Sequence, residues 1–164
     1  MRIHRITYPD INNGLGCRVS LWVSGCEHCC KGCHNPETWS FESGREFTDD
    51  DKKILFEILS KPYIKGITLT GGDPVYSHKE IVLLLKEIRE KFPTKDVWLY
   101  TGFDIGFIEK RGFSGILDYI DVVVDGPYIE MLRDVSLAFR GSSNQTIWEK
   151  VDGKFEISKL NGAK

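Results

Sequence analysis

Four cysteines lie within eight residues of this chain, between positions 26 and 33. Cys26, Cys30 and Cys33 form a C-x3-C-x2-C pattern, which places three thiols on one loop without an obvious fourth ligand. Thiolates are standard ligands of zinc and of iron–sulfur clusters. A metal centre with three protein ligands keeps one position open, and catalytic metal sites use such a position to bind their substrate. This loop is therefore the first candidate for chemistry.

The loop alone leaves several interpretations open. A structural zinc site would recruit His28 or His34 to complete a Cys3His set. An iron–sulfur cluster would use three cysteines, with either Cys29 or Cys30 as the middle ligand. A dithiol redox site on one of the C-x2-C pairs is disfavoured because the thioredoxin-like context is absent.

The composition indicates an ordinary globular protein. The 164 residues are 41% hydrophobic and 28% charged, enough for a single core. A net charge of −2 argues against non-specific binding of nucleic acid. No apolar run approaches the ~20 residues of a membrane span, and the N-terminus lacks the apolar stretch of a secretory signal. We therefore expect a cytoplasmic protein, in which clustered cysteines stay reduced and act as metal ligands or catalytic thiols.

Strands alternate with helices along the chain. Apolar periodicity predicts strands over residues 18–24, 66–70, 95–101 and 119–124. Helices are predicted after Thr48, after Ser77 and from Asp104 towards residue 110. Ser77 and Glu80 fit an S-x-x-E capping box, and the helix after Thr48 ends before Pro62.

This alternation indicates a single α/β domain over residues 1–164. Because 164 residues cannot close an eight-stranded barrel of ~250, we expect a partial βα barrel or an open, curved and mostly parallel sheet. Residues 146–164 are predicted to add a C-terminal hairpin that turns at Asp152 and Gly153.

Three further loops follow predicted strands, over residues 70–74, 100–102 and 125–127. In α/β folds the loops at the carboxyl ends of the strands carry the active site. Gly71 and Gly72 permit close approach of the backbone to a ligand, and the Asp73 carboxylate suits an ammonium group. The competing interpretation is an ordinary turn in which Asp73 serves the following helix.

These motifs, in this order, resemble the radical S-adenosylmethionine superfamily. Residues 13–18 and 33–39, on either side of the cysteine loop, resemble the glycyl-radical-enzyme activases within it. Residues 70–74, 124–126 and 140–145 extend the resemblance to the family that activates anaerobic (class III) ribonucleoside-triphosphate reductases. The resemblance spans roughly residues 8–145. Leu15 departs from it, standing where activases usually have proline, and Cys29 is an additional thiol.

The resemblance implies a [4Fe–4S] cluster held by Cys26, Cys30 and Cys33, with S-adenosyl-L-methionine bound to the fourth iron. It implies no catalytic side chain, because the cluster and the cofactor carry the chemistry. Asp125 either meets the ribose or adenine of the cofactor or caps a turn. The implied cofactor-binding residues are Gly32, Cys33, His34, Gly71, Gly72, Asp73 and Asp125.

The implied activity is reductive cleavage of S-adenosyl-L-methionine and generation of a glycyl radical on the reductase. The partners would be the reductase and a low-potential electron donor such as flavodoxin, with neither nucleic acid nor membrane. The alternatives are an activase of the pyruvate formate-lyase type, a small-molecule radical enzyme of the deazaguanine-forming type, and a non-catalytic zinc-binding module.

Overall fold

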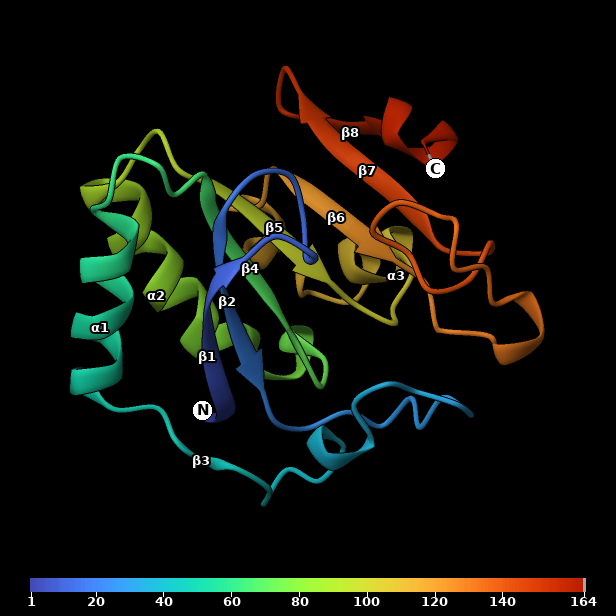
Figure 1. Ribbon diagram of the computed structural model, residues 1–164, viewed down its shortest axis with the longest axis horizontal. Coiled ribbons are helices and arrows are strands. Elements are labelled where there is room, and N and C mark those ends of the chain that lie inside the picture. The colour runs from blue at the N-terminus through green and yellow to red at the C-terminus, as the bar shows by residue number, and fades with distance from the viewer. Residues whose placement is uncertain (164) are drawn as a thin grey trace.

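A computed structural model describes residues 1–163, without the side chain of Ser114, so Lys164 of the predicted domain lies outside the described residues. Within residues 1–163, eight strands form one open sheet in the order β3-β1-β2-β4-β5-β6-β7-β8 (Figure 1). The strands are β1 (Arg2–Asp10), β2 (Arg18–Val23), β3 (Arg45–Glu46), β4 (Gly66–Gly71), β5 (Asp96–Tyr100), β6 (Val122–Asp125), β7 (Thr146–Val151) and β8 (Lys154–Ile157). The helices are α1 (Asp49–Leu59), α2 (His78–Lys91), α3 (Ile105–Lys110) and α4 (Ser114–Leu117).

The centre of the sheet is built from three parallel pairings. Strands β2, β4, β5 and β6 lie side by side in chain order, and each connection between them carries at least one helix. Because every crossover advances in the same direction, the helices lie on one face of the sheet. The carboxyl ends of these four strands consequently meet at one edge, where the cysteine loop follows β2 (Figure 1).

The prediction of a mostly parallel sheet is wrong. Among residues 1–163, four of the seven pairings are antiparallel: β1–β2, β1–β3, β6–β7 and β7–β8. Two of these pairings follow from short connections: a parallel pairing needs a crossover of a dozen or more residues, and residues 11–17 between β1 and β2 and residues 152–153 between β7 and β8 are too few. Over residues 1–163 the sheet is mixed and open, and it does not close into a barrel.

The two faces of the sheet have different neighbours. On the helix face, Val19, Leu21 and Val23 of β2 are fully buried in the main core against the helices, as their alternation predicted. On the opposite face, Trp98 packs with Val122 and other apolar side chains of β6 and β7 in a smaller cluster. The carboxyl end of this second face is left for the candidate site.

The predicted helix caps differ in outcome. Thr48 is the N-cap of α1, as predicted, and forms a reciprocal capping box with Asp51. Ser77 is the N-cap residue of α2 but makes no side-chain capping hydrogen bond, so the predicted capping box is wrong. The reason is local: Ser77 already ends a 3-10 turn, η2 (Pro74–Ser77), and Glu80 pairs instead with the N-terminal amine.

The chain ends extend the sheet on both sides. The C-terminal hairpin turns at Asp152 and Gly153, and β7 joins the main sheet through β6. At the other side β1, which the sequence analysis did not predict, pairs with β2 and forms one wall of the site. Within the described residues, no helix has both the length and the apolar character needed to cross a membrane.

A buried ion pair ties together the amino ends of the central strands. The Arg18 side chain is fully buried, and one guanidinium nitrogen lies 2.6 Å from a carboxylate oxygen of Asp96. The same guanidinium donates to the Thr68 hydroxyl and to the carbonyls of Leu15 and Ile67. Arg18 thus connects β2, β4 and β5 at the end of the sheet opposite the cysteine loop.

Candidate functional site

The cysteine loop is closed at its base by the backbone. The Gly25 N–H donates to the Thr38 carbonyl (2.8 Å), and the Cys26 N–H donates to the Trp39 carbonyl (2.9 Å). A 3-10 turn, η1 (Pro36–Thr38), begins the return limb, and the Thr38 hydroxyl bonds the Asn35 carbonyl within it. The loop between these limbs carries the four clustered cysteines at the carboxyl edge of the sheet.

Three of the cysteines face one cavity. Cys26, Cys30 and Cys33 line a cavity of about 160 Å³, called here the smaller cavity, which also borders Gly71 and Gly72. Among residues 1–163, no three Cys, His, Asp or Glu side chains are gathered into a metal-binding group, so these thiols face the cavity without ligand geometry. The donor set nevertheless fits an iron–sulfur cluster, because three soft sulfur ligands from one loop border the same cavity.

Cys29 is placed differently from its neighbours. Its side chain is exposed, is not among those that line the smaller cavity, and donates back to the Cys26 carbonyl at 3.9 Å. Its φ of 46° lies in the left-handed region, which is uncommon for a residue with a side chain. This turn directs the thiol away from the cavity that receives Cys26 and Cys30.

Burial changes the pKa values of the Cys26 and Cys30 thiols. Burial raises the pKa of Cys26 to about 11, and it also raises the pKa of Cys30. Free thiols in these positions are therefore protonated at neutral pH. Because metals bind the thiolate form, loading of this site releases protons.

The glycine loop forms the wall next to the cysteines. The Gly72 N–H donates to the Val23 carbonyl (2.8 Å) and the Asp73 N–H donates to the Gly25 carbonyl (2.9 Å), which continues the β2–β4 pairing beyond both strands. A side chain at Gly72 would place its Cβ 2.5 Å from the Gly25 carbonyl oxygen. The glycines are thus needed for close backbone contact between the two loops.

Asp73 is buried, with 1% of its surface exposed. One carboxylate oxygen accepts hydrogen bonds from the Thr101 hydroxyl, the Gly102 N–H and the His28 ring, all between 2.8 and 2.9 Å. The other oxygen accepts from the Val75 N–H at 3.0 Å and so caps η2. Asp73 borders the smaller cavity, but the protein itself satisfies most of its acceptor capacity.

The other predicted cofactor residues lie in three places. Gly32 has a φ of 75°, and a side chain there would meet Glu130 rather than either cavity. His34 is exposed and lines the larger cavity described below. Asp125 faces the helices, where its carboxylate accepts a hydrogen bond from the Ile105 N–H at 2.9 Å. Burial raises the pKa of this carboxyl group. Asp125 does not line the smaller cavity, whereas its neighbour Gly126 does.

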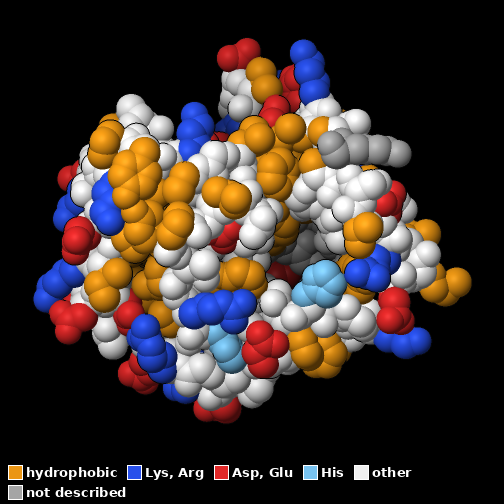
Figure 2. Space-filling view, in the orientation of Figure 1, with side chains coloured by type: hydrophobic (Ala, Val, Ile, Leu, Met, Phe, Trp, Pro, Cys, Tyr) orange, Lys and Arg blue, Asp and Glu red, His pale blue; other side chains and the backbone are white. Residues whose placement is uncertain are grey.

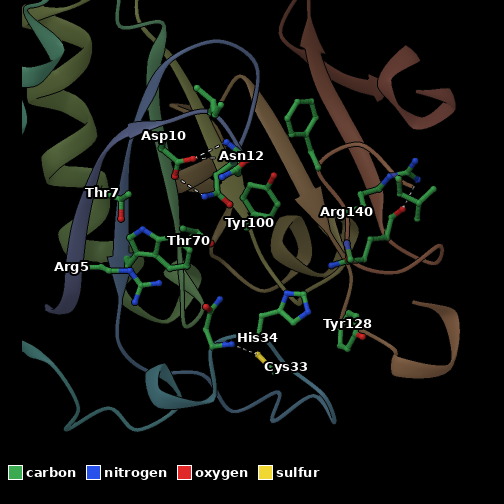
Figure 3. Close-up of a pocket in the computed structure, with 18 of the residues that line it drawn as sticks. Arg5, Thr7, Asp10, Asn12, Cys33, His34, Thr70, Tyr100, Tyr128 and Arg140 are labelled. Atoms are coloured by element: carbon green, nitrogen blue, oxygen red, sulfur yellow. Dashed lines mark hydrogen bonds between the residues drawn. The ribbon is translucent and has the colours of Figure 1, made fainter. Parts of the chain in front are cut away.

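A larger cavity, of about 720 Å³, opens beside the smaller one. Figure 2 shows that this face of the molecule is hollowed, with basic and histidine side chains near the opening. Arg5 and Arg140 approach the larger cavity from opposite sides, with Cys33 and His34 between them (Figure 3). The residues that line both cavities are Cys33, Asn35, Thr70, Tyr100, Tyr128 and Gln145.

The strand β1 supplies one wall of the larger cavity. The Arg5 guanidinium lies 4.0 Å from the ring centre of Trp22, a cation–π arrangement. Farther along the same wall, Asp10 accepts hydrogen bonds from Ser20, Asn12 and Asn13 (Figure 3). Burial acts to raise the pKa of Asp10, but these hydrogen bonds outweigh burial and hold it below its usual value.

Residues 140–145 build the opposite wall. Gln145 accepts from the Gly141 N–H and donates to the Gly126 carbonyl, while the Arg140 guanidinium donates to the carbonyls of Gln145 and Asn161. This network fixes the loop after β6 next to both cavities. The sequence offered no basis for assigning these roles.

Two other site residues were missed. Arg5 was missed because β1 was not predicted, and Tyr128 because nothing marked it beyond its position after Asp125, Gly126 and Pro127. From the sequence alone, His28 was named only as a candidate ligand of a structural zinc. His28 is instead bonded to Asp73.

Comparison with known proteins first defines the class. Residues 12–148 match the family model described as a 4Fe-4S single cluster domain. This range includes the cysteine loop, the glycine loop, residues 140–145 and most of the sheet. The chain is thus an iron–sulfur cluster domain protein.

Curated relatives narrow the class. The chain is 44% identical to the anaerobic ribonucleoside-triphosphate reductase-activating protein of Enterobacteria phage T4, over 93% of this chain and 97% of that protein. The proteins of the same name from Haemophilus influenzae and Escherichia coli K12 are 41% and 40% identical, over 85% and 90% of this chain and 93% and 97% of theirs. The chain belongs to the family of anaerobic ribonucleoside-triphosphate reductase-activating proteins.

Proposed function

We propose that this protein activates an anaerobic ribonucleoside-triphosphate reductase by generating a glycyl radical on it. The activity follows the name that its relatives carry. The observation that carries the proposal is the set of three thiols, Cys26, Cys30 and Cys33, that line one cavity beside Gly71 and Gly72. When bound, a [4Fe–4S] cluster and S-adenosyl-L-methionine supply one-electron reductive chemistry whose products are methionine, 5′-deoxyadenosine and the glycyl radical.

The residues have separate tasks in this proposal. The three thiols hold the cluster, and the backbone of Gly71 and Gly72 lies against the methionine part of the cofactor. Asp73 fixes the shape of that wall through its hydrogen bonds to the loop after β5. The Asn35 N–H donates to the Cys33 sulfur at 3.4 Å, and such hydrogen bonds tune the potential of a cluster.

The remaining predicted residues contribute around this centre. Cys33 lies where the two cavities meet, His34 lines the larger cavity, and Gly32 lets the cysteine loop pass close to Glu130. Asp125 lies on the helix face of the sheet and holds the start of α3 through its hydrogen bond with the Ile105 N–H. The whole chain, including the C-terminal hairpin, forms one radical S-adenosylmethionine domain in this proposal.

The larger cavity is the proposed place for the glycine-bearing segment of the reductase. Its volume of about 720 Å³ is within the range of ligand sites, and it meets the smaller cavity at Cys33, Thr70 and Tyr100. A low-potential donor such as flavodoxin would supply the electron. A reducing compartment such as the cytoplasm would keep the cysteine ligands available.

Reconstitution tests this function. Protein loaded anaerobically with iron and sulfide, then mixed with a strong reductant, S-adenosyl-L-methionine and the reductase, is expected to release methionine and 5′-deoxyadenosine in equal amounts, as measured by chromatography. Protein loaded with zinc serves as the control and should release neither. If protein with an intact cluster leaves S-adenosyl-L-methionine uncleaved, the proposed function is wrong.

A further inference from the structure

His28 projects from the cysteine loop into the edge of the sheet. Only 17% of its side chain is exposed, although the loop itself is largely on the surface. Its Nε2 lies 2.8 Å from an oxygen of Asp73, and its ring meets the Phe103 ring edge-on at 4.5 Å between centres. The side chain therefore joins the middle of the cysteine loop to the loops that follow β4 and β5.

The surroundings of Asp73 determine which partner donates in its hydrogen bond with His28. The same carboxylate oxygen accepts hydrogen bonds from the Thr101 hydroxyl and the Gly102 N–H, so it acts as an acceptor towards all its neighbours. Nε2 of His28 accordingly carries the proton and donates to Asp73. The buried Asp73 carboxylate thus connects its own glycine loop with the cysteine loop and the loop after β5 at the rim of the smaller cavity.

The loop after β5 leaves room for the His28 ring. A Cβ at position 102 would lie 2.5 Å from Cδ2 of His28, so Gly102 provides a space that a side chain would fill. The ring also borders the smaller cavity together with Cys26 and Cys30, the predicted ligands on either side of it in sequence. The backbone N–H of His28 lies against the Cys26 sulfur. A fixed His28 therefore fixes the local path of the chain at that sulfur.

We propose that His28 is a positioning residue that docks the cysteine loop onto Asp73 and thereby orients Cys26 and Cys30 towards the smaller cavity. The loop needs such an anchor because its backbone is held at the base, at Gly25 and Cys26, while Cys30 and Cys33 lie beyond it. The inference rests on the proposed function in one respect: the smaller cavity must hold the cluster.

Substitutions at His28 test the docking role. His28→Ala removes the donor, His28→Asn keeps a polar group that is too short to reach Asp73, and His28→Gln restores a donor at similar length. Glu27→Ala, a change at the exposed neighbouring residue, is the matched control. Iron and sulfide per chain are measured after anaerobic reconstitution, together with electron paramagnetic resonance spectra of the reduced cluster before and after S-adenosyl-L-methionine.

We expect His28→Ala and His28→Asn to lose at least half of the iron and sulfide, with an altered cluster spectrum, and His28→Gln and Glu27→Ala to match the unmodified protein. A wild-type iron content and spectrum in His28→Asn would overturn the inference, even if His28→Ala does not fold. Failure of His28→Gln to restore the spectrum would also overturn it. If instead the unmodified protein takes up no iron and sulfide, the proposed function itself fails.

Discussion

Cys30→Ala is expected to abolish the cluster, whereas Cys29→Ala leaves it in place. The two cysteines are adjacent in sequence, but only Cys30 lines the smaller cavity, while Cys29 turns outward and bonds the Cys26 carbonyl. Removing Cys30 leaves two of the three thiols that line the cavity, and the exposed Cys29 thiol does not line it. Iron and sulfide analysis after anaerobic reconstitution should give about four of each per chain for Cys29→Ala and less than about one for Cys30→Ala.

Cys26→Ala and Cys33→Ala should behave like Cys30→Ala, since their thiols line the same cavity. Cys17→Ala is a second control, because Cys17 packs against the main core outside the loop. The ligand assignment is wrong if Cys29→Ala loses the cluster while Cys30→Ala keeps it. That result would favour the alternative spacing in which Cys29 is the middle ligand.

Arg18→Ala should be the most destabilising change at the opposite end of the sheet. The substitution removes a fully buried guanidinium that bonds Thr68 and two carbonyls, and it leaves Asp96 without its ion-pair partner. Breaking a buried pair costs about 3–5 kcal/mol. Because 23% of the Asp96 side chain is exposed, water screens part of this loss and we expect the lower end, about 3 kcal/mol.

Urea unfolding of the metal-free protein, followed by far-ultraviolet circular dichroism, measures this cost. Lys86→Ala removes an exposed basic side chain and should change the free energy of unfolding by no more than about 0.5 kcal/mol. A loss below about 1 kcal/mol for Arg18→Ala would contradict the anchoring role of the ion pair.

The central strands were predictable because their burial in the sheet restricts them to short runs of apolar residues that stand out in the sequence. Strand β2 alternates Val19, Leu21 and Val23 with the residues of the other face, and it was found with nearly correct bounds. Strand β1 was missed because its pairing with β2 shifts register between Ile3 and Arg5 and again after Thr7, which breaks the alternation. Without β1, the antiparallel share of the sheet was underestimated.

The candidate site was predictable where chemistry restricts the residue type. Cysteines at fixed spacing and two adjacent glycines stand out in one sequence, and the structure brings Cys26, Cys30 and Cys33 to one cavity with Gly71 and Gly72. Contacts that depend on tertiary arrangement left no such pattern. The hydrogen bond from His28 to Asp73 joins residues 45 positions apart, and the wall with Arg5 exists only because β1 pairs beside β2.

The most direct test of the account combines the reconstituted protein, S-adenosyl-L-methionine, a reductant and the candidate reductase, and records the electron paramagnetic resonance spectrum. The account predicts a glycyl radical signal on the reductase that depends on every component and disappears with Cys30→Ala. Absence of a glycyl radical from a mixture in which the cluster is intact and S-adenosyl-L-methionine is cleaved would contradict it.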